Sequence, residues 1–211
     1  MPAAKDLIAV ARAELGVKES PAGSNKVKYN TWYYGREVSG PSFPWCMAFV
    51  QWCCDRAGVA LPVLTASCTA LMVEARKAGM WVTSGYREGD IVLYDWGRDR
   101  YPDHCGVVES VSGPQITAIE GNTAVGNDSN GGCVMERVRT EKAILGAVRP
   151  CYEEEPNMDN IPSKAHKEAV EWAVANGILT GGRDGDLMLS QSVTRQQLCT
   201  MLYRYAKLNG K

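Results

Sequence analysis

The chain has 211 residues, of which 45% are hydrophobic, and a formal net charge of -1 from 23 basic and 24 acidic side chains. That length and apolar fraction suffice for one sizeable core and leave room for a second, smaller module. The sequence contains no lysine- or arginine-rich run of the kind that neutralises a phosphate backbone. Nucleic acid is therefore excluded as an expected partner.

The N-terminal segment, residues 1–16, carries Lys5, Asp6, Arg12 and Glu14 within its apolar pattern. It lacks the uninterrupted apolar stretch of a signal peptide, and it is too short and polar to span a membrane. We therefore expect synthesis in the cytoplasm without a signal peptide, and no membrane partner. In that compartment the eight cysteines are expected to stay reduced rather than to form a disulfide framework.

Apolar residues at helical spacing predict helices in the first part of the chain. These helices are expected over residues 7–15, 45–57 and 67–78. Between the first two, residues 18–44 are rich in Gly, Ser, Asn and Pro and predict an ordered loop. Helical phase places Cys46 on the buried face of the second helix, at its N-terminal end.

A change of period follows, with short apolar or β-branched runs separated by turn residues. The runs cover residues 91–96, 105–111, 115–120, 133–138 and 144–149. Helices followed by antiparallel strands predict an α+β fold. An acidic, proline-containing linker is expected at 152–160, and a helix-loop-helix at 161–211 that is too small to be stable without support.

A candidate thiol nucleophile stands at the start of the second helix. Cys46 meets the unpaired N–H groups and macrodipole of a helix N-terminus, which favour a thiolate. Of the two histidines, His166 looks like a solvated helix residue, whereas His104 lies where a polar turn enters a strand. Cys53 and Cys54 are interpreted as packing, because they lack the C-x2-C spacing and paired histidine of a zinc site.

A hairpin is expected to bring a carboxylate beside that histidine. Two antiparallel strands joined at residues 112–114 would place His104 next to Glu120, as a base and the group that orients it must be. Strand alternation puts Cys105 on the opposite face from His104, so we expect only one thiol, Cys46, to meet the imidazole.

Five segments, in this order, resemble the CHAP (cysteine, histidine-dependent amidohydrolase/peptidase) domain: GSNKVKYNTWYYG, PWCMAFVQW, GDIVLYDW, DHCGVVESV and AIEGNT. The resemblance covers residues 1–151 and implies a papain-like (NlpC/P60-type) domain that cleaves amide bonds of bacterial peptidoglycan. It also implies Cys46 as nucleophile, His104 as general base, Glu120 as the residue that holds the imidazole, and Asn122 as a supporting polar group.

The C-terminal segment, residues 161–211, is similar to one S-layer homology (SLH) repeat, through its NGI-x-TG turn and the Thr-Arg pair that opens the second helix. Such repeats commonly hold proteins on cell-wall polymers of Gram-positive bacteria. One copy stands where three are usual, so the resemblance leaves open wall binding, another use, or oligomerisation that supplies further copies.

Clustered aromatic residues near Cys46 fit either a core or a substrate groove. We predict substrate contact for Trp32, Tyr34 and Trp45. The segment before Cys46 offers Glu37 and asparagines but no charged oxygen cage, so no calcium site is expected, and the predicted chemistry requires no metal or cofactor.

The sequence thus predicts an endolysin- or autolysin-type hydrolase of Gram-positive peptidoglycan, released to the wall through a holin. The bond is expected to be that of an N-acetylmuramoyl-L-alanine amidase or of a peptidoglycan endopeptidase. Two alternatives stay open. One is a transglutaminase-like acyltransferase or protein-directed cysteine protease with the same triad, and the other is a non-catalytic wall-binding protein.

Overall fold

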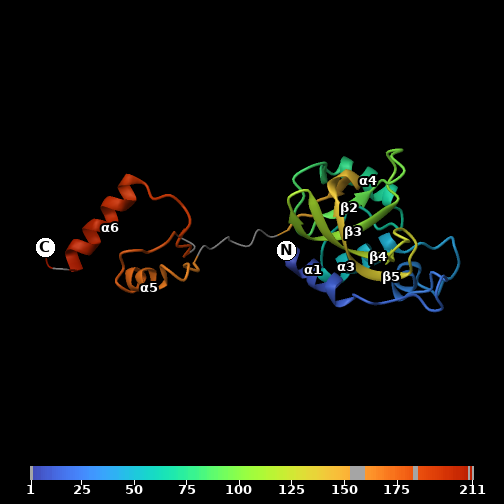
Figure 1. Ribbon diagram of the computed structural model, residues 1–211, viewed down its shortest axis with the longest axis horizontal. Coiled ribbons are helices and arrows are strands. Elements are labelled where there is room, and N and C mark those ends of the chain that lie inside the picture. Colours follow the sequence, from blue (N-terminus) through green and yellow to red (C-terminus); the bar gives the residue numbers. More distant parts are fainter. Residues whose placement is uncertain (1, 153–159, 183–184, 209, 211) are drawn as a thin grey trace. The chain divides into compact units, whose positions relative to one another are not determined.

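The computed structural model of the chain describes residues 2–152, 160–182, 185–208 and 210 (Figure 1). The chain forms two compact units that divide between residues 153 and 154. Most of the expected linker, residues 153–159, lies outside the described residues. Within the described ranges, no helix combines the length and the apolar character needed to cross a membrane.

The N-terminal unit combines helices with an antiparallel sheet, which confirms the predicted α+β class (Figure 1). Its helices are α1 (Ala4–Ala13), α2 (Lys28–Tyr34), α3 (Cys46–Ala57), α4 (Cys68–Lys77) and the short 3-10 helix η1 (Glu141–Ala143). Its strands are β1 (Trp81–Val82), β2 (Ile91–Tyr94), β3 (His104–Ser112), β4 (Gln115–Thr123), β5 (Cys133–Thr140) and β6 (Ile144–Val148).

In the described residues the strands form one six-stranded sheet in the order β1-β6-β2-β3-β4-β5, with every neighbouring pair antiparallel. The predicted hairpin joins β3 and β4, and Gly113 in its turn has the positive φ of 56° that favours glycine. Tyr94 of β2 pairs with His104 of β3, so the central strands place His104 at one end of the sheet.

Apolar residues on the two faces of the sheet form separate cores. The larger core lies between the sheet and helices α1, α3 and α4, and contains Phe49 of α3 and Val107 of β3. The smaller core lies on the opposite face and contains Tyr94 and Val108. Helix α3 comes very close to β4, since a Cβ at Gly121 would lie 2.6 Å from the Cβ of Phe49. The site described below lies where these layers meet.

The structure differs from the sequence predictions at two short elements. Helix α2 lies inside residues 18–44, which were predicted to be a loop, and strand β1 was not predicted. Tyr29 and Asn30 of α2 are buried, and the Asn30 amide donates to the backbone oxygens of two loop residues. Tertiary packing therefore holds a helix whose aromatic and β-branched residues have only modest intrinsic helix propensity.

The C-terminal unit contains helices α5 (Lys167–Ala175) and α6 (Arg195–Leu208). Trp172 of α5 contacts Tyr205 of α6 edge-on at a centroid distance of 6.3 Å. Arg204 donates to the backbone oxygen of Ile178 and to the hydroxyl of Thr180 in the connecting segment. These contacts tie the two helices to the loop, which lines a cavity of about 460 Å³ in this unit.

Candidate active site

Cys46 is the first residue of helix α3, as predicted, and Trp45 is its N-cap. The side chain is buried, with 7% of the residue exposed. Hydrogen bonds from the thiols of Cys105 and Cys68 lower the pKa of Cys46 well below its ordinary value; burial opposes them, and the charge of His104 adds to them. The thiolate is therefore the favoured form of Cys46.

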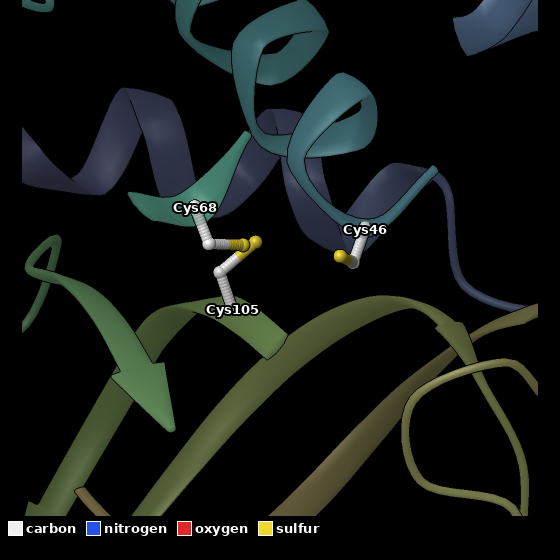
Figure 2. A group of neighbouring side chains, drawn as sticks. All are labelled: Cys46, Cys68 and Cys105. Atoms are coloured by element: carbon white, nitrogen blue, oxygen red, sulfur yellow. The ribbon is translucent and has the colours of Figure 1, made fainter. Parts of the chain in front are cut away.

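In the described residues, Cys46 is the thiol that acts on the imidazole of His104. The thiols of Cys68 and Cys105 converge on Cys46 (Figure 2), and this was not expected. Strand alternation itself holds: Cys105 lies in the helix-side core, whereas Val108 lies in the core on the other face. Groups from both faces act on the Cys46 thiol, since Cys105 and His104 both lower its pKa. Cys68 belongs to a separate helix, and its role was not predicted.

His104 is the first residue of β3 and is fully buried. Its Nε2 lies 3.1 Å from Oε2 of Glu120, as the hairpin prediction requires. Burial alone would lower the pKa of His104, but the interactions with Cys46 and Glu120 outweigh it and raise the pKa to about 9. Nδ1 makes no well-aligned hydrogen bond within the described residues, which leaves it for the Cys46 thiol. Such contacts are often loose in a free enzyme.

Glu120 reaches His104 over Gly106, where strand β3 carries no side chain. A Cβ at Gly106 would lie 2.8 Å from Cγ of Glu120, so the absence of a side chain there makes room for the carboxylate. Arg139 of β5 binds both oxygens of Glu120, at 2.9 Å and 2.6 Å. Burial would raise the pKa of Glu120, but hydrogen bonds from Arg139 and His104 prevail and lower it. Glu120 is therefore held as a charged, oriented acceptor.

Arg139 was not predicted to belong to the site. Besides Glu120 it binds Asp128 at 2.9 Å, and its guanidinium lies over the ring of Trp96 at 5.4 Å. Two arginines at positions 137 and 139 share one face of β5, and this is the signal that could have indicated a buried carboxylate partner.

Trp96 is the second residue that the sequence did not predict. Its ring stacks on the His104 imidazole, with centroids 5.5 Å apart and planes inclined by 25°. The carboxylate of Asp103 accepts from the backbone N–H groups of Trp96 and Gly97, which fixes this loop next to the histidine. The imidazole is therefore held by Trp96 at its face and by Glu120 at its edge.

Asn122 is buried but directed at a loop rather than at the imidazole. Its side chain donates to Asn130 and accepts from the backbone N–H of Gly132. Its φ of 60° lies in the left-handed region, which Asn tolerates better than most residues. The role that these contacts support is to anchor the 130–132 loop at the end of β4.

Of the three aromatic residues predicted to contact substrate, one lies in the core. Trp45 has no exposed surface and stacks on Tyr29 at 5.4 Å, so the prediction that it contacts substrate is wrong and it is a core residue. The hydrophobic gain from burying so large a ring decided its place. Trp32 and Tyr34 of α2 are partly exposed, and Tyr34 packs edge-on against Phe43 at 5.2 Å. Their contact with substrate stays a prediction.

The arrangement described so far places a cysteine with a lowered pKa beside a histidine that is oriented by a carboxylate. Residues 38–122 match the CHAP domain. The matched range includes Cys46, His104, Glu120 and Asn122, while Arg139 lies beyond it. No curated protein matches the chain.

Solved structures that are similar to the chain include the following three. A crystal structure of Ly7917 with the hydrolyzing product of MDP has a TM-score of 0.43 and 17% identity, and covers 70% of this chain and 62% of that chain. A second crystal structure of Ly7917 has a TM-score of 0.41 and 15% identity, with the same coverage of 70% and 62%. The wild-type endolysin LysIME-EF1 has a TM-score of 0.41 and 11% identity over 83% of this chain and 86% of that chain. The chain thus spans less than two thirds of the Ly7917 structures.

Proposed function

We propose that the protein is a peptidoglycan hydrolase that cleaves an amide bond of the bacterial cell wall with Cys46 as nucleophile. The observation that carries the proposal is the convergence of Cys46, His104 and Glu120 in one buried cluster, inside the residues that match the CHAP domain. A thiolate beside an imidazolium that is oriented by a carboxylate is the arrangement that acyl transfer through a thioester requires.

In the proposed first step, the Cys46 sulfur attacks the carbonyl carbon of the amide. The backbone N–H groups at the start of α3 are the donors best placed to stabilise the oxyanion. Nδ1 of His104 gives its proton to the leaving amine, because Nε2 is engaged with Glu120. The products of this step are the free amine and a thioester on Cys46.

In the second step, water hydrolyses the thioester. Neutral His104 accepts a proton from the water as it attacks, and the acid product leaves as the Cys46 thiolate is restored. Glu120 keeps the imidazole in one tautomer and stabilises its charged form, and Arg139 keeps Glu120 ionised. Residues that hold His104 thus act through it and need no contact with the substrate.

Wall zymography tests the proposal. Purified wild-type protein is expected to clear Gram-positive cell walls, and Cys46→Ala is expected to give no clearing. Equal clearing by both proteins would contradict the assigned nucleophile. If the wild type clears no walls but is retained on them, the result would favour the alternative of a non-catalytic wall-binding protein. If it instead cleaves a protein substrate or transfers an acyl group to one, the result would favour the alternative of a cysteine protease or transglutaminase-like acyltransferase.

The bond that is cut is proposed to be either the N-acetylmuramoyl-L-alanine amide or a peptide cross-bridge amide. Both reactions follow from the same thioester chemistry, so the two are separated by their products. Mass spectrometry of digested peptidoglycan is expected to show a free lactyl group for the amidase, or a new peptide N-terminus for the endopeptidase.

For the C-terminal unit, we propose binding to a secondary cell-wall polymer, with self-association as a means of presenting several copies. Half-exposed aromatic residues on both helices, Trp172 and Tyr205, and the cavity of about 460 Å³ support a binding role. A protein truncated at residue 157 is expected to cut soluble muropeptides but to lose wall pull-down. Unchanged pull-down would contradict this role, and a monomeric full-length chain in sedimentation would contradict self-association.

The proposed place of action is the cell wall, after release from the cytoplasm through a holin-type pore. Co-expression with and without a holin tests this: lysis is expected only when the holin is present. Lysis by the protein alone would contradict the proposed route.

A further inference from the structure

Two further thiols, those of Cys68 and Cys105, converge on the proposed nucleophile Cys46, although the proposed hydrolysis uses only Cys46. The sulfur atoms of Cys46, Cys68 and Cys105 all lie within 4.8 Å of one another, and all three residues are buried. They come from the first turn of α3, the first turn of α4 and strand β3, and their side chains point toward a common centre (Figure 2). Among the described residues, this is the one such group of potential metal ligands.

The spacing of the sulfur atoms suits a metal ion. A Zn–S bond is about 2.3 Å long, so three thiolates around one ion in a plane lie about 4 Å apart. Separations within 4.8 Å therefore need only small side-chain rotations to reach that geometry. Three thiolates favour soft d10 cations over Mg²⁺ or Ca²⁺, which prefer oxygen ligands.

A further donor lies beside one of the three thiols, that of Cys46. Nδ1 of His104 is fully buried and makes no well-aligned hydrogen bond in the part of the chain that the structure describes. Its imidazole interacts with the Cys46 thiol, although His104 is not among the ligand atoms that lie within 4.8 Å of one another. The other ring nitrogen binds Glu120, the kind of partner that orients a metal-binding histidine.

We propose that Cys46, Cys68 and Cys105 bind one thiophilic d10 cation, represented by Zn²⁺, and that the bound ion blocks the nucleophile. The ion takes the sulfur electron pair with which Cys46 would attack a carbonyl. Metal binding needs only the three thiols, whereas its inhibitory effect rests on the proposed hydrolase function. The sequence predicted no metal site, because its cysteines lack ligand spacing and come together only in the fold.

Buried cysteines elsewhere in the N-terminal unit provide an internal contrast. Cys53 and Cys54 are also buried on α3, yet they belong to no group of converging ligands in the described ranges. Burial raises the pKa of both thiols, as it does that of Cys105, so the contrast lies in the positions of the sulfur atoms. A Cys53→Ser variant therefore controls for the general effect of placing a hydroxyl in this core.

The binding test uses the full-length chain with the three remaining thiols removed as Cys133→Ser, Cys151→Ser and Cys199→Ser. The reduced protein is titrated with Cd²⁺, followed by thiolate-to-metal charge-transfer absorption, and Zn²⁺ is measured by competition. We expect one ion per chain. Cys68→Ser and Cys105→Ser should weaken binding at least about 100-fold, because they remove direct ligands, whereas Cys53→Ser should not change it.

Absence of a charge-transfer signal would overturn the metal site. So would a metal affinity of Cys68→Ser and Cys105→Ser that equals the affinity of the protein with all three thiols. Near-ultraviolet circular dichroism checks that the variants are folded, and Cys105→Ala offers a second, apolar replacement if the serine disturbs the core. Because the alanine also removes the ligand, the same loss of affinity is expected, and retained affinity would count against the site.

Activity links the site to the proposed hydrolysis. Wall clearing by the wild type is expected to stop at saturating Zn²⁺ and to recover with a chelator, and the inhibitory concentration should rise in Cys68→Ser by the same factor as the dissociation constant. If the protein binds metal but clears no walls under any condition, the metal site would be supported and the proposed hydrolase function contradicted. Clearing that Zn²⁺ does not affect would overturn the inhibitory role.

Discussion

The two units of the chain differ most in how completely they bury their apolar side chains. In the N-terminal unit, Trp45 and Phe49 have no exposed surface and lie within a continuous core. In the described part of the C-terminal unit, Ile178 is the one buried hydrophobic residue, while Trp172 and Tyr203 are exposed by 50% and 62%. The first unit therefore has a rigid interior, and the second has an open apolar surface.

This difference separates the kinds of work that each unit can do. His104 and Glu120 are fully buried and Arg139 binds Glu120, and the low polarity of the interior strengthens the interactions between them. Catalytic chemistry depends on that positioning. An exposed helix-loop-helix gives a weaker hold on any single side chain but presents surface for a large partner. The variants below compare the units, from the largest expected effect to the smallest.

The largest difference is expected between the two histidines. His104→Ala removes the group that carries the proton in both proposed steps, so wall hydrolysis should fall at least about 10⁴-fold. His166→Ala in the C-terminal unit removes an exposed imidazole that, among the described residues, bonds with its neighbour Ser163, and activity on soluble muropeptides should not change. Turnover of soluble muropeptides measures the activity of both variants. Similar losses of activity in His104→Ala and His166→Ala would contradict the expected difference between the two histidines.

Core truncation should destabilise the N-terminal unit strongly. Phe49 is fully buried, contacts Tyr29 edge-on at 5.1 Å, and lies against Gly121. Phe49→Ala is expected to lower the free energy of unfolding by about 4 kcal/mol, through lost burial and the cavity left behind. Urea unfolding followed by tryptophan fluorescence measures this. A loss below about 1 kcal/mol would mean that the core repacks and is less rigid than inferred.

Arg139→Met tests the buried charges behind His104. It leaves the fully buried Glu120 without its bidentate partner, and breaking such a pair costs about 3 kcal/mol of unfolding free energy. Activity should also fall, because Glu120 then orients His104 less firmly. Arg204→Met in the C-terminal unit is the matched control and should cost less than about 1 kcal/mol, since Arg204 donates to neutral oxygens near solvent.

Rescue by Arg139→Lys separates positioning from general stability. The lysine restores a positive charge but not the bidentate geometry, so stability should return in part while the pH profile stays altered. Full recovery of both would show that charge alone suffices at this position.

The pH dependence of activity should follow the Cys46 and His104 pair. Because the pKa of Cys46 is lowered and that of His104 is raised to about 9, the thiolate–imidazolium form is favoured between the two values. Activity should therefore stay level through neutral pH and fall roughly tenfold per pH unit above about 9, as His104 loses its proton. A rate profile on soluble muropeptides checks this, and a fall that begins near pH 6.5 would contradict the pairing.

The same shift affects stability with a defined sign. A histidine whose pKa rises from 6.5 in the unfolded chain to about 9 in the folded one binds its proton more tightly when folded. Its contribution to stability is then fully present below pH 6.5 and is lost as the pH rises through about 9. His104→Ala should flatten this part of the stability curve.

The sequence predicted most helices and strands of the N-terminal unit and part of its candidate site. Helix phase predicted the buried position of Cys46 at the N-terminal end of α3, and the expected hairpin places His104 next to Glu120, because local periodicity decides both. Arg139 and Trp96 were not predicted, since their relation to His104 depends on strand order and on a loop held by hydrogen bonds. The convergence of thiols likewise depends on the placement of α4, which no local pattern specifies.

The smallest effect is expected in the C-terminal unit itself. Trp172 is half exposed and contacts Tyr205 at 6.3 Å, so Trp172→Ala removes little buried surface. The unfolding free energy should change by less than about 1 kcal/mol, although the residue is as large as the buried Trp45. If the ring instead contacts a wall polymer, the same variant should weaken wall pull-down while muropeptide turnover stays the same. A large loss of stability without loss of pull-down would mean that Trp172 belongs to a core. The contrast between the buried N-terminal interior, which positions the proposed catalytic groups, and the exposed C-terminal surface, which is proposed to bind the wall, would then not hold for Trp172.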